Sequence, residues 1–260
     1  MTIPFIKMHG LGNDYVYIDG FRQETAALLT KVNLAALARR VSDRHFGIGS
    51  DGLVLIFPSE EADACMRIFN ADGSEAQMCG NAVRCVGKYL YESGLCHDVH
   101  MQIETLAGIR VLSLQVSHGR VEQVTVNMGR PVIQPDSIQI GMDPIDYTSV
   151  NMGNPHAVFF RNDLPKLPVN TNIEFVNVRN EKELDVRVIE RGSGETLACG
   201  TGACAAAVAA IYHGLTEQTV TVHLPGGELM IQWSTNSSPV FMTGPATEVF
   251  RGEYHWEDEQ

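Results

Sequence analysis

The chain repeats one stretch of sequence, Asn70-Ala-Asp-Gly-Ser-Glu75-Ala-Gln-Met-Cys79-Gly80, as Glu190-Arg-Gly-Ser-Gly-Glu195-Thr-Leu-Ala-Cys199-Gly200, at an offset of 120 residues. In both copies a glutamate lies four residues before the cysteine and a glycine follows it. We interpret this as an internal duplication in which both copies keep a thiol. A fold duplicated about a pseudo-twofold axis brings equivalent positions face to face, so we expect Cys79 and Cys199 to meet across one cleft. Two opposed thiols suit a reaction that takes a proton from one face of a carbon and returns one to the other.

The repeat extends over both halves of the chain. Near its start each half has a Gly-Asn pair, Gly12-Asn13 or Gly153-Asn154. Near its end each half has a glycine followed closely by a proline. Asn13 precedes Cys79 by 66 residues, whereas Asn154 precedes Cys199 by only 45, so the second half lacks an insertion. We expect an N-terminal lobe at residues 1–134 and a C-terminal lobe at 135–260, with the last strand a candidate to cross back to the first lobe. The junction, 131–144, has three prolines and no helical period.

Most of the chain has the composition of short strands separated by turn residues. Runs rich in β-branched residues predict strands at 5–8, 15–19, 53–57, 64–69, 99–105, 110–116, 121–128, 157–160, 173–178, 183–189, 218–223 and 228–233. Residues 33–41 have the period of a surface helix. The segments after the two cysteines are apolar nearly all round, which indicates buried helices. The sequence therefore predicts an α+β fold in which antiparallel strands wrap around a central helix in each lobe.

Composition favours a small-molecule partner in the cytoplasm. The formal charge of -12 and the scattered 19 Lys and Arg residues argue against nucleic acid or an anionic membrane surface. The N-terminal sequence shows no basic region followed by an apolar core, so we expect no export signal. The longest small apolar run, 203–212, is far shorter than a membrane span. Six cysteines in this setting indicate reduced, free thiols.

A cysteine followed by a glycine at a helix start is a site for chemistry. Unpaired backbone N–H groups and the helix dipole lower the pKa of a thiol and bind anions such as a carboxylate. For Cys65, Cys85, Cys96 and Cys204 we favour the simpler interpretation of buried, inert thiols.

Other uses of the cysteines fit less well. No C-x2-C spacing indicates zinc or a redox pair, so we expect no metal. A cysteine hydrolase with His156 as base would leave the second cysteine unexplained. The nucleotide-binding glycine motifs are absent from the sequence, and none of the five lysines lies in a Schiff-base context, so we expect no cofactor.

These motifs together resemble the diaminopimelate epimerase family. The resemblance rests on His9-Gly-Leu-Gly-Asn-Asp-Tyr15, Gly47-Ile-Gly-Ser-Asp-Gly52, Phe69-Asn-Ala-Asp-Gly-Ser-Glu75, Met78-Cys-Gly-Asn-Ala-Val-Arg-Cys85, Met152-Gly-Asn-Pro-His156 and Glu190-Arg-Gly-Ser-Gly-Glu-Thr-Leu-Ala-Cys-Gly-Thr-Gly-Ala-Cys204, in order along the whole chain. It implies cofactor-independent interconversion of LL- and meso-diaminopimelate for lysine and peptidoglycan precursor synthesis. It also implies two β-barrel-like lobes, each around a central helix, and a homodimer.

The resemblance also assigns site residues. Cys79 and Cys199 would be the catalytic acid and base. Substrate contacts would fall on Asn13, Asn70, Gly80, Asn81, Asn154, Asn172, Glu190, Arg191, Gly200 and Thr201, with His156 and Glu190 supporting catalysis. These types suit a ligand with two amino acid ends, since Arg191 can grip a distal carboxylate through two hydrogen bonds and the amides can donate or accept.

Three places depart from the family pattern. Gly52 stands where some members carry a glutamine that contacts substrate, Ala82 stands where glycine is common, and the tract 161–171 is short. The alternatives that stay open are proline racemase, a racemase of another amino acid, and an amino acid binding protein with incidental thiols.

Overall fold

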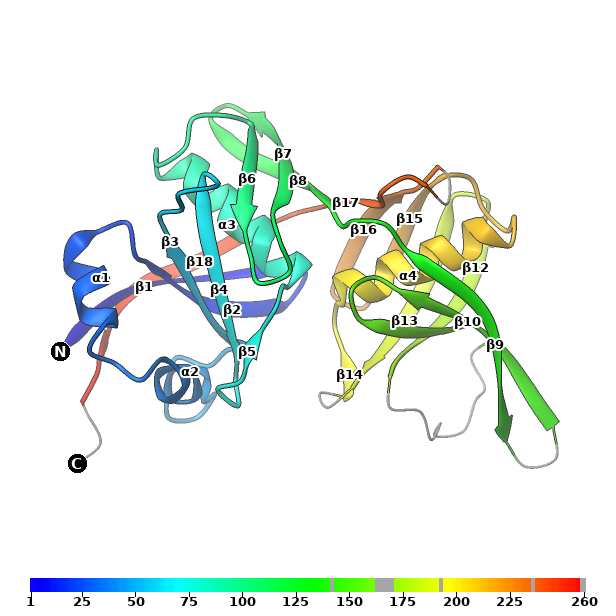
Figure 1. The fold of residues 1–260 in the computed structure, drawn as a ribbon, viewed down its shortest axis with the longest axis horizontal. Helices are drawn as coiled ribbons and strands as arrows, with labels where there is room; N and C mark the ends of the chain where they lie inside the picture. Colours follow the sequence, from blue (N-terminus) through cyan, green and yellow to red (C-terminus); the bar gives the residue numbers. More distant parts are fainter. Residues whose placement is uncertain (141–142, 162–170, 192–193, 235–236, 258–260) are drawn as a thin grey trace. The chain divides into compact units, whose positions relative to one another are not determined.

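The chain folds into two compact units, Met1–Thr125 with Pro245–Gln260, and Val126–Gly244 (Figure 1). The computed structural model describes residues 1–140, 143–161, 171–191, 194–234 and 237–257. The division differs from the expected boundary at 134/135 because that point lies inside a strand, β9 (Val132–Ile140), which pairs with β10 (Asp143–Asn151).

The first unit is a mixed sheet with a buried helix. Its strands are β1 (Thr2–Gly10), β2 (Asn13–Asp19), β3 (Gly52–Phe57), β4 (Ala64–Asn70), β5 (Glu75–Ala76), β6 (His100–Glu104), β7 (Arg110–Ser117), β8 (Arg120–Asn127) and β18 (Thr247–His255). The pairing runs β18–β1–β2–β3–β4, and β4 then pairs with both β5 and β6. The crossover from β4 to the parallel β6 contains α3 (Gly80–Glu92), which packs against β1, β2, β6 and β7.

The second unit repeats this scheme. Its further strands are β11 (Pro155–Phe159), β12 (Asn172–Asn180), β13 (Glu183–Glu190), β14 (Gly194–Thr196), β15 (Thr219–Leu224), β16 (Gly227–Gln232) and β17 (Phe241–Gly244). Strands β9–β10–β11–β12–β13 pair in order, and β13 then pairs with both β14 and β15. The helix α4 (Gly200–Tyr212) fills the crossover to the parallel β15 and lies against the strands (Figure 1).

The predicted α+β class with strands around a helix is confirmed. The sheets are mixed rather than purely antiparallel, because β2–β3 and β4–β6 are parallel in the first unit, as are β11–β12 and β13–β15 in the second. Parallel neighbours need a crossover connection rather than a tight turn, and the crossovers β2–β3, β4–β6 and β13–β15 contain the helices of the described chain. Among the described residues, the pairings leave each sheet open.

The length difference between the copies lies in one connection. Between β2 and β3 the chain forms α1 (Gln23–Leu29) and α2 (Leu34–Ser42), whose apolar faces, which include Leu37, cover the sheet around Val16 and Leu53. The corresponding connection between β11 and β12 is residues 160–171, most of which lie outside the described part. The short tract at 161–171 is therefore the counterpart of two helices in the first unit.

The described residues of the junction 131–144 belong largely to two paired strands, β9 and the start of β10, which the sequence did not predict. Pro135 pairs with Thr148 across the β9–β10 ladder. Proline cannot donate to a ladder and is tolerated where its nitrogen points away from a partner, as on an outer strand. The prolines that resembled a linker are therefore compatible with a strand.

Candidate active site

The two cysteines hold equivalent backbone positions. Each is the extended N-cap residue of its helix, with φ of -137° at Cys79 and -121° at Cys199. The carbonyl of each accepts the first helical hydrogen bond, from Val83 at 3.0 Å and from Ala203 at 2.9 Å. Gly80 and Gly200 are thus the first helical residues. Each follows the short strand, β5 or β14, that precedes the helix of its unit.

In the first unit, the Cys79 thiol lies in a cluster of amides. Its Sγ donates to Oδ1 of Asn13 at 3.4 Å, and Asn81 Nδ2 donates to the same oxygen at 3.2 Å. Asn13 comes from the start of β2 and Asn81 from the first turn of α3. The structure therefore brings Asn13, Cys79, Gly80 and Asn81 together.

A charged network orients the Asn13 amide. Its Nδ2 donates to Asp51 Oδ2 at 2.8 Å, which turns Oδ1 toward the thiol. Arg44 Nη2 bridges Asp51 Oδ1 at 2.9 Å and Asp14 Oδ1 at 2.7 Å, and Lys7, a buried residue, pairs with Asp14. Burial acts in the opposite direction, but the hydrogen bonds from Arg44 and Lys7 hold the pKa of Asp14 below its usual value.

Asn70 has a local role in the structure. Its Nδ2 donates to Ser74 Oγ at 3.0 Å, and its backbone closes the turn between β4 and β5 with Ser74 and Gly73. The described contacts of Asn70 are therefore those of a turn residue.

In the second unit, Cys199 is buried and accepts a backbone hydrogen bond. Gly202 N–H donates to Cys199 Sγ at 3.4 Å, and Thr201 Oγ1 lies 3.5 Å from the same sulfur. Burial, followed by the charges of Glu190 and Glu174, raises the pKa of the Cys199 thiol well above its usual value. The sequence predicted a lowered pKa from the helix start. For Cys199 that prediction is wrong, because burial and two carboxylates outweigh the backbone N–H.

A chain of side chains reaches from the sheet to the start of α4. His156 Nδ1 lies 2.6 Å from Oε1 of Glu174, and His156 Nε2 lies 3.1 Å from Oδ1 of Asn154. Asn154 Nδ2 in turn donates to Thr201 Oγ1 at 3.4 Å. Burial raises the pKa of Glu174, while the charge and hydrogen bond of His156 act against that rise.

The remaining predicted residues of this unit lie at the ends of β12 and β13. Asn172 Oδ1 accepts from Arg191 N–H at 3.0 Å, and Asn172 Nδ2 donates to the Pro155 carbonyl at 3.2 Å. Glu190 Oε1 accepts from Thr196 Oγ1 at 2.7 Å. Asn172 therefore fixes the backbone of Arg191 beside the strand end.

Sequence reasoning missed two carboxylates. Asp51 was part of a quoted motif, but its role depends on a contact with Asn13, 38 residues away in the chain. Glu174 is a single charged residue within the apolar run of β12, and it is fully buried. An acidic residue inside such a run was the available signal, because a charge is buried only with a partner.

The structure explains the glycine at position 52. A Cβ added to Gly52 would lie 2.1 Å from the Phe69 carbonyl oxygen, on the paired strand β4. No side chain fits there without a backbone shift, so the glutamine of some family members would require a different path of β3 relative to β4.

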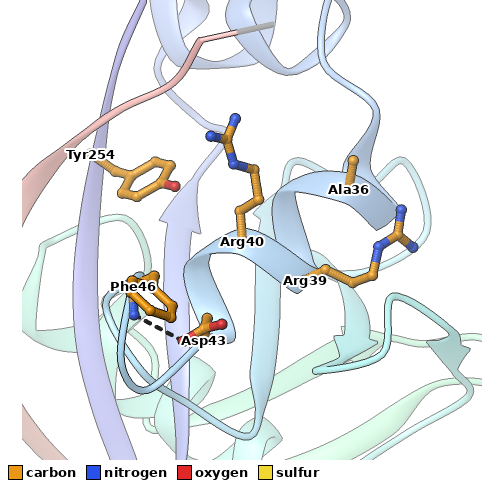
Figure 2. Close-up of a pocket in the computed structure, with 6 residues that line it drawn as sticks. All are labelled: Ala36, Arg39, Arg40, Asp43, Phe46 and Tyr254. Atoms are coloured by element: carbon orange, nitrogen blue, oxygen red, sulfur yellow. Dashed lines mark hydrogen bonds between the residues drawn. The ribbon is translucent and has the colours of Figure 1, made fainter. Parts of the chain in front are cut away.

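A separate hollow lies on the outer side of α2. It is lined by Ala36, Arg39, Arg40, Asp43, Phe46 and Tyr254, and Figure 2 shows Phe46 N–H directed to the Asp43 carboxylate. Arg40 donates to the Glu257 carbonyl at 2.9 Å and lies over the Trp256 ring. Because its lining includes none of the predicted site residues, this hollow is not where we place the chemistry.

Across the described ranges, no three His, Cys, Asp or Glu side chains converge as a metal ion would need. None of the helices that the structure describes is long and apolar enough to cross a membrane.

Each unit carries a cysteine at the start of its buried helix, as the sequence motifs indicated. The model of the family "Diaminopimelate epimerase" matches residues 5–134 and 161–249. The chain belongs to the diaminopimelate epimerase family, which confirms the resemblance drawn from the motifs.

The sequence relatives cover nearly the whole chain. A diaminopimelate epimerase of Acetivibrio thermocellus is 48% identical, covering 96% of this chain and 97% of its own. One from Methanococcus maripaludis is 45% identical, covering 96% and 99%.

Solved structures extend the likeness at the level of fold. A PhzF family protein of Bacillus anthracis superposes with a TM-score of 0.72 at 19% identity, covering 98% of this chain and 100% of its own. A hydroxyproline epimerase of Agrobacterium vitis gives 0.69 at 14% identity, covering 97% and 92%. At these identities the likeness concerns the fold alone.

Proposed function

We propose that the chain interconverts LL- and meso-diaminopimelate without a cofactor, using Cys79 and Cys199 as a pair of acid and base. The observation that carries this proposal is the equivalent placement of the two cysteines as N-caps of α3 and α4. Membership of the diaminopimelate epimerase family supports the substrate. Sequence relatives bearing that name favour it over proline racemase, which has support only at the level of fold.

In the proposed reaction one cysteine acts as thiolate and the other as thiol. The thiolate removes the α-hydrogen of the bound amino acid, and the opposite thiol delivers its proton to the other face of the same carbon. As the first proton leaves, negative charge develops on the substrate carboxylate. The N–H groups at Gly80 and Gly200, each at a helix start, are suited to stabilise that charge.

The other predicted residues would hold the substrate. Arg191 and Glu190 would bind the charged distal end, and Asn13, Asn154 and Asn172 would contact its polar groups, each from the end of a strand. Asn70, Asn81 and Thr201 complete the proposed set, with His156 supporting the second thiol. Closure of the two lobes over the substrate would expel water and strengthen these contacts.

The proposed setting follows from the same family. We place the enzyme in the cytoplasm as a homodimer, in lysine and peptidoglycan precursor synthesis. Analytical ultracentrifugation tests the dimer, and a monomeric protein would leave the reaction proposal intact.

Isotope exchange tests the reaction and its two-base form. LL-diaminopimelate, L-proline and L-glutamate are each incubated with the protein in D2O. With separate acid and base, meso product carries deuterium at the inverted carbon early in the reaction, while recovered LL-substrate carries almost none. Turnover of proline instead would favour a racemase of that type. No exchange with any amino acid would favour a binding protein, and strong labelling of recovered substrate would overturn the two-base mechanism.

A further inference from the structure

Glu174 occupies a position that is apolar in the other copy of the repeat. Its register neighbours are Val158 on β11 and Val188 on β13. The equivalent position in the first unit is Val54, on the strand β3 that lies between β2 and β4. One copy thus has a fully buried carboxyl where the other has a valine. A buried carboxyl costs stability unless it is well partnered, so its presence here calls for a function.

The carboxyl of Glu174 lies against the start of α4. A Cβ added to Gly202 would lie 2.8 Å from Glu174 Oε1 and 3.3 Å from Cys199 Sγ. The carboxyl and the thiol therefore approach the same glycine. Within the described residues, Oε2 of Glu174 has no hydrogen-bond partner, so His156 alone holds the group through Oε1.

Proton counting makes the pair of Glu174 and His156 neutral. One proton lies between Oε1 of Glu174 and Nδ1 of His156, which are 2.6 Å apart. Nε2 of His156 carries a second proton, because the Asn154 Oδ1 that it contacts can only accept a hydrogen bond. Two protons give no net charge, whether the shared one belongs to the carboxyl or to the ring. A thiolate can then form at Cys199 beside a neutral pair rather than beside a full negative charge.

We propose that Glu174 is a positioning residue for Cys199: by sharing a proton with His156 it fixes the ring, and through Asn154 and Thr201 it sets the surroundings of the sulfur. The inference rests on the proposed function. The charged groups that act on Cys199 are Glu190 on β13 and Glu174 on β12, and His156 on β11 contacts Glu174. Cys204 follows five residues later on α4.

The test replaces Glu174 by glutamine, which keeps the size of the side chain. Glutamine can accept from Nδ1–H but cannot share a proton, so Nε2 becomes an acceptor and the Asn154 amide turns away from Thr201. We expect kcat for LL-diaminopimelate to fall roughly tenfold to a hundredfold with little change in KM. Glu183→Gln is the matched control, because it removes the carboxylate of another Glu–His contact of the same unit, at 3.2 Å from His223 Nε2.

A second measurement is independent of the substrate. Iodoacetamide labels each cysteine as a function of pH, and mass spectrometry quantifies Cys199 with Cys79 of the same molecule as reference. With the Asn154 amide turned, the Thr201 hydroxyl donates to that amide and no longer to the sulfur, where it would stabilise a thiolate. The Cys199 profile should therefore shift to higher pH in E174Q, and the Cys79 profile should stay unchanged. Glu183→Gln should shift neither.

The outcomes separate this proposal from the proposed function. Coincident Cys199 profiles in folded E174Q and wild type would overturn the role of Glu174, even if diaminopimelate is the substrate. Absence of turnover in wild type would refute the reaction, whereas a shifted Cys199 profile would still support the positioning contact. If E174Q does not fold, Glu174→Val, which installs the residue of the first unit, undergoes the same labelling.

Discussion

At the scale of single residues, the two sulfur atoms differ in the direction of their hydrogen bonds. Cys79 donates to the Asn13 amide oxygen, whereas Cys199 accepts from the Gly202 N–H. Both cysteines are extended N-cap residues, but the partner of Cys79 comes from strand β2, whereas the partner of Cys199 lies in the first turn of its own helix, α4. The duplication fixes where the thiols are, and residues such as Asp51 and Glu174 fix how each thiol is held.

Substitution of the cysteines separates the two proposed catalytic thiols from the others. We expect Cys79→Ala and Cys199→Ala each to abolish epimerisation, because each removes one half of the acid–base pair. Cys65→Ala, Cys96→Ala and Cys204→Ala should keep turnover near wild type in the same assay of LL-diaminopimelate. Wild-type turnover in either of the first two would sink the mechanism.

The charged network behind Asn13 should make stability depend on pH. The pKa of Asp14 is lower in the folded protein than its usual value, so its contribution is complete above that value and is lost as the pH falls toward the folded pKa. Asp14→Asn also leaves Lys7 buried without its carboxylate, which should cost about 3 kcal/mol near neutral pH. Urea unfolding of both proteins between about pH 7 and about pH 3 measures this. A difference that stays constant over that range would contradict the prediction.

At the scale of elements, the sequence predicted the helices whose apolar pattern lies within a single segment. The helices after Cys79 and Cys199 and the helix at 33–41 agree with α3, α4 and α2, because their apolar periods are complete within the segment. The sequence indicated a last strand as a candidate to cross back to the first lobe but did not predict the bounds of β18, since its residues are mostly exposed and its only described partner is β1, at the other end of the chain. Likewise, the motifs identified Asn13 and His156, but the contacts of Asp51 and Glu174 depend on strand pairing and were not visible.

Two glycines of the first unit lie where a neighbouring strand comes close to their backbone. At Gly52 a new Cβ would meet a backbone oxygen of β4, whereas at Gly87 of α3 it would meet the end of the flexible Leu112 side chain at 2.7 Å. We expect Gly52→Ala to destabilise the fold by about 1 to 3 kcal/mol, because the strands must shift. Gly87→Ala should be nearly neutral, since alanine favours the helix and Leu112 can move. Equal loss of stability in both, measured by urea unfolding, would argue against this distinction between backbone and side-chain contacts.

At the scale of the whole molecule, each unit carries one of the two proposed reaction partners. If the cysteines face a common substrate when the lobes close, mild oxidation should join Cys79 and Cys199 in a disulfide. Activity should then fall and return with dithiothreitol, and peptide mass mapping of the inactive protein should find that crosslink. Inactivation without it, for instance by a crosslink between other cysteines, would count against their proximity.

The pairing of β18 with β1 gives the molecule a cyclic order. The second unit takes its outermost strand, β9, from directly before β10, whereas the first unit takes the equivalent strand, β18, from the opposite end of the chain. Met1 and Trp256 exchange two backbone hydrogen bonds, at 2.6 and 2.7 Å, so the ends of this cycle lie side by side. A circular permutant joined there and opened between Gly244 and Pro245 would read as two uninterrupted tandem repeats. The observed chain is the same ring cut one strand later.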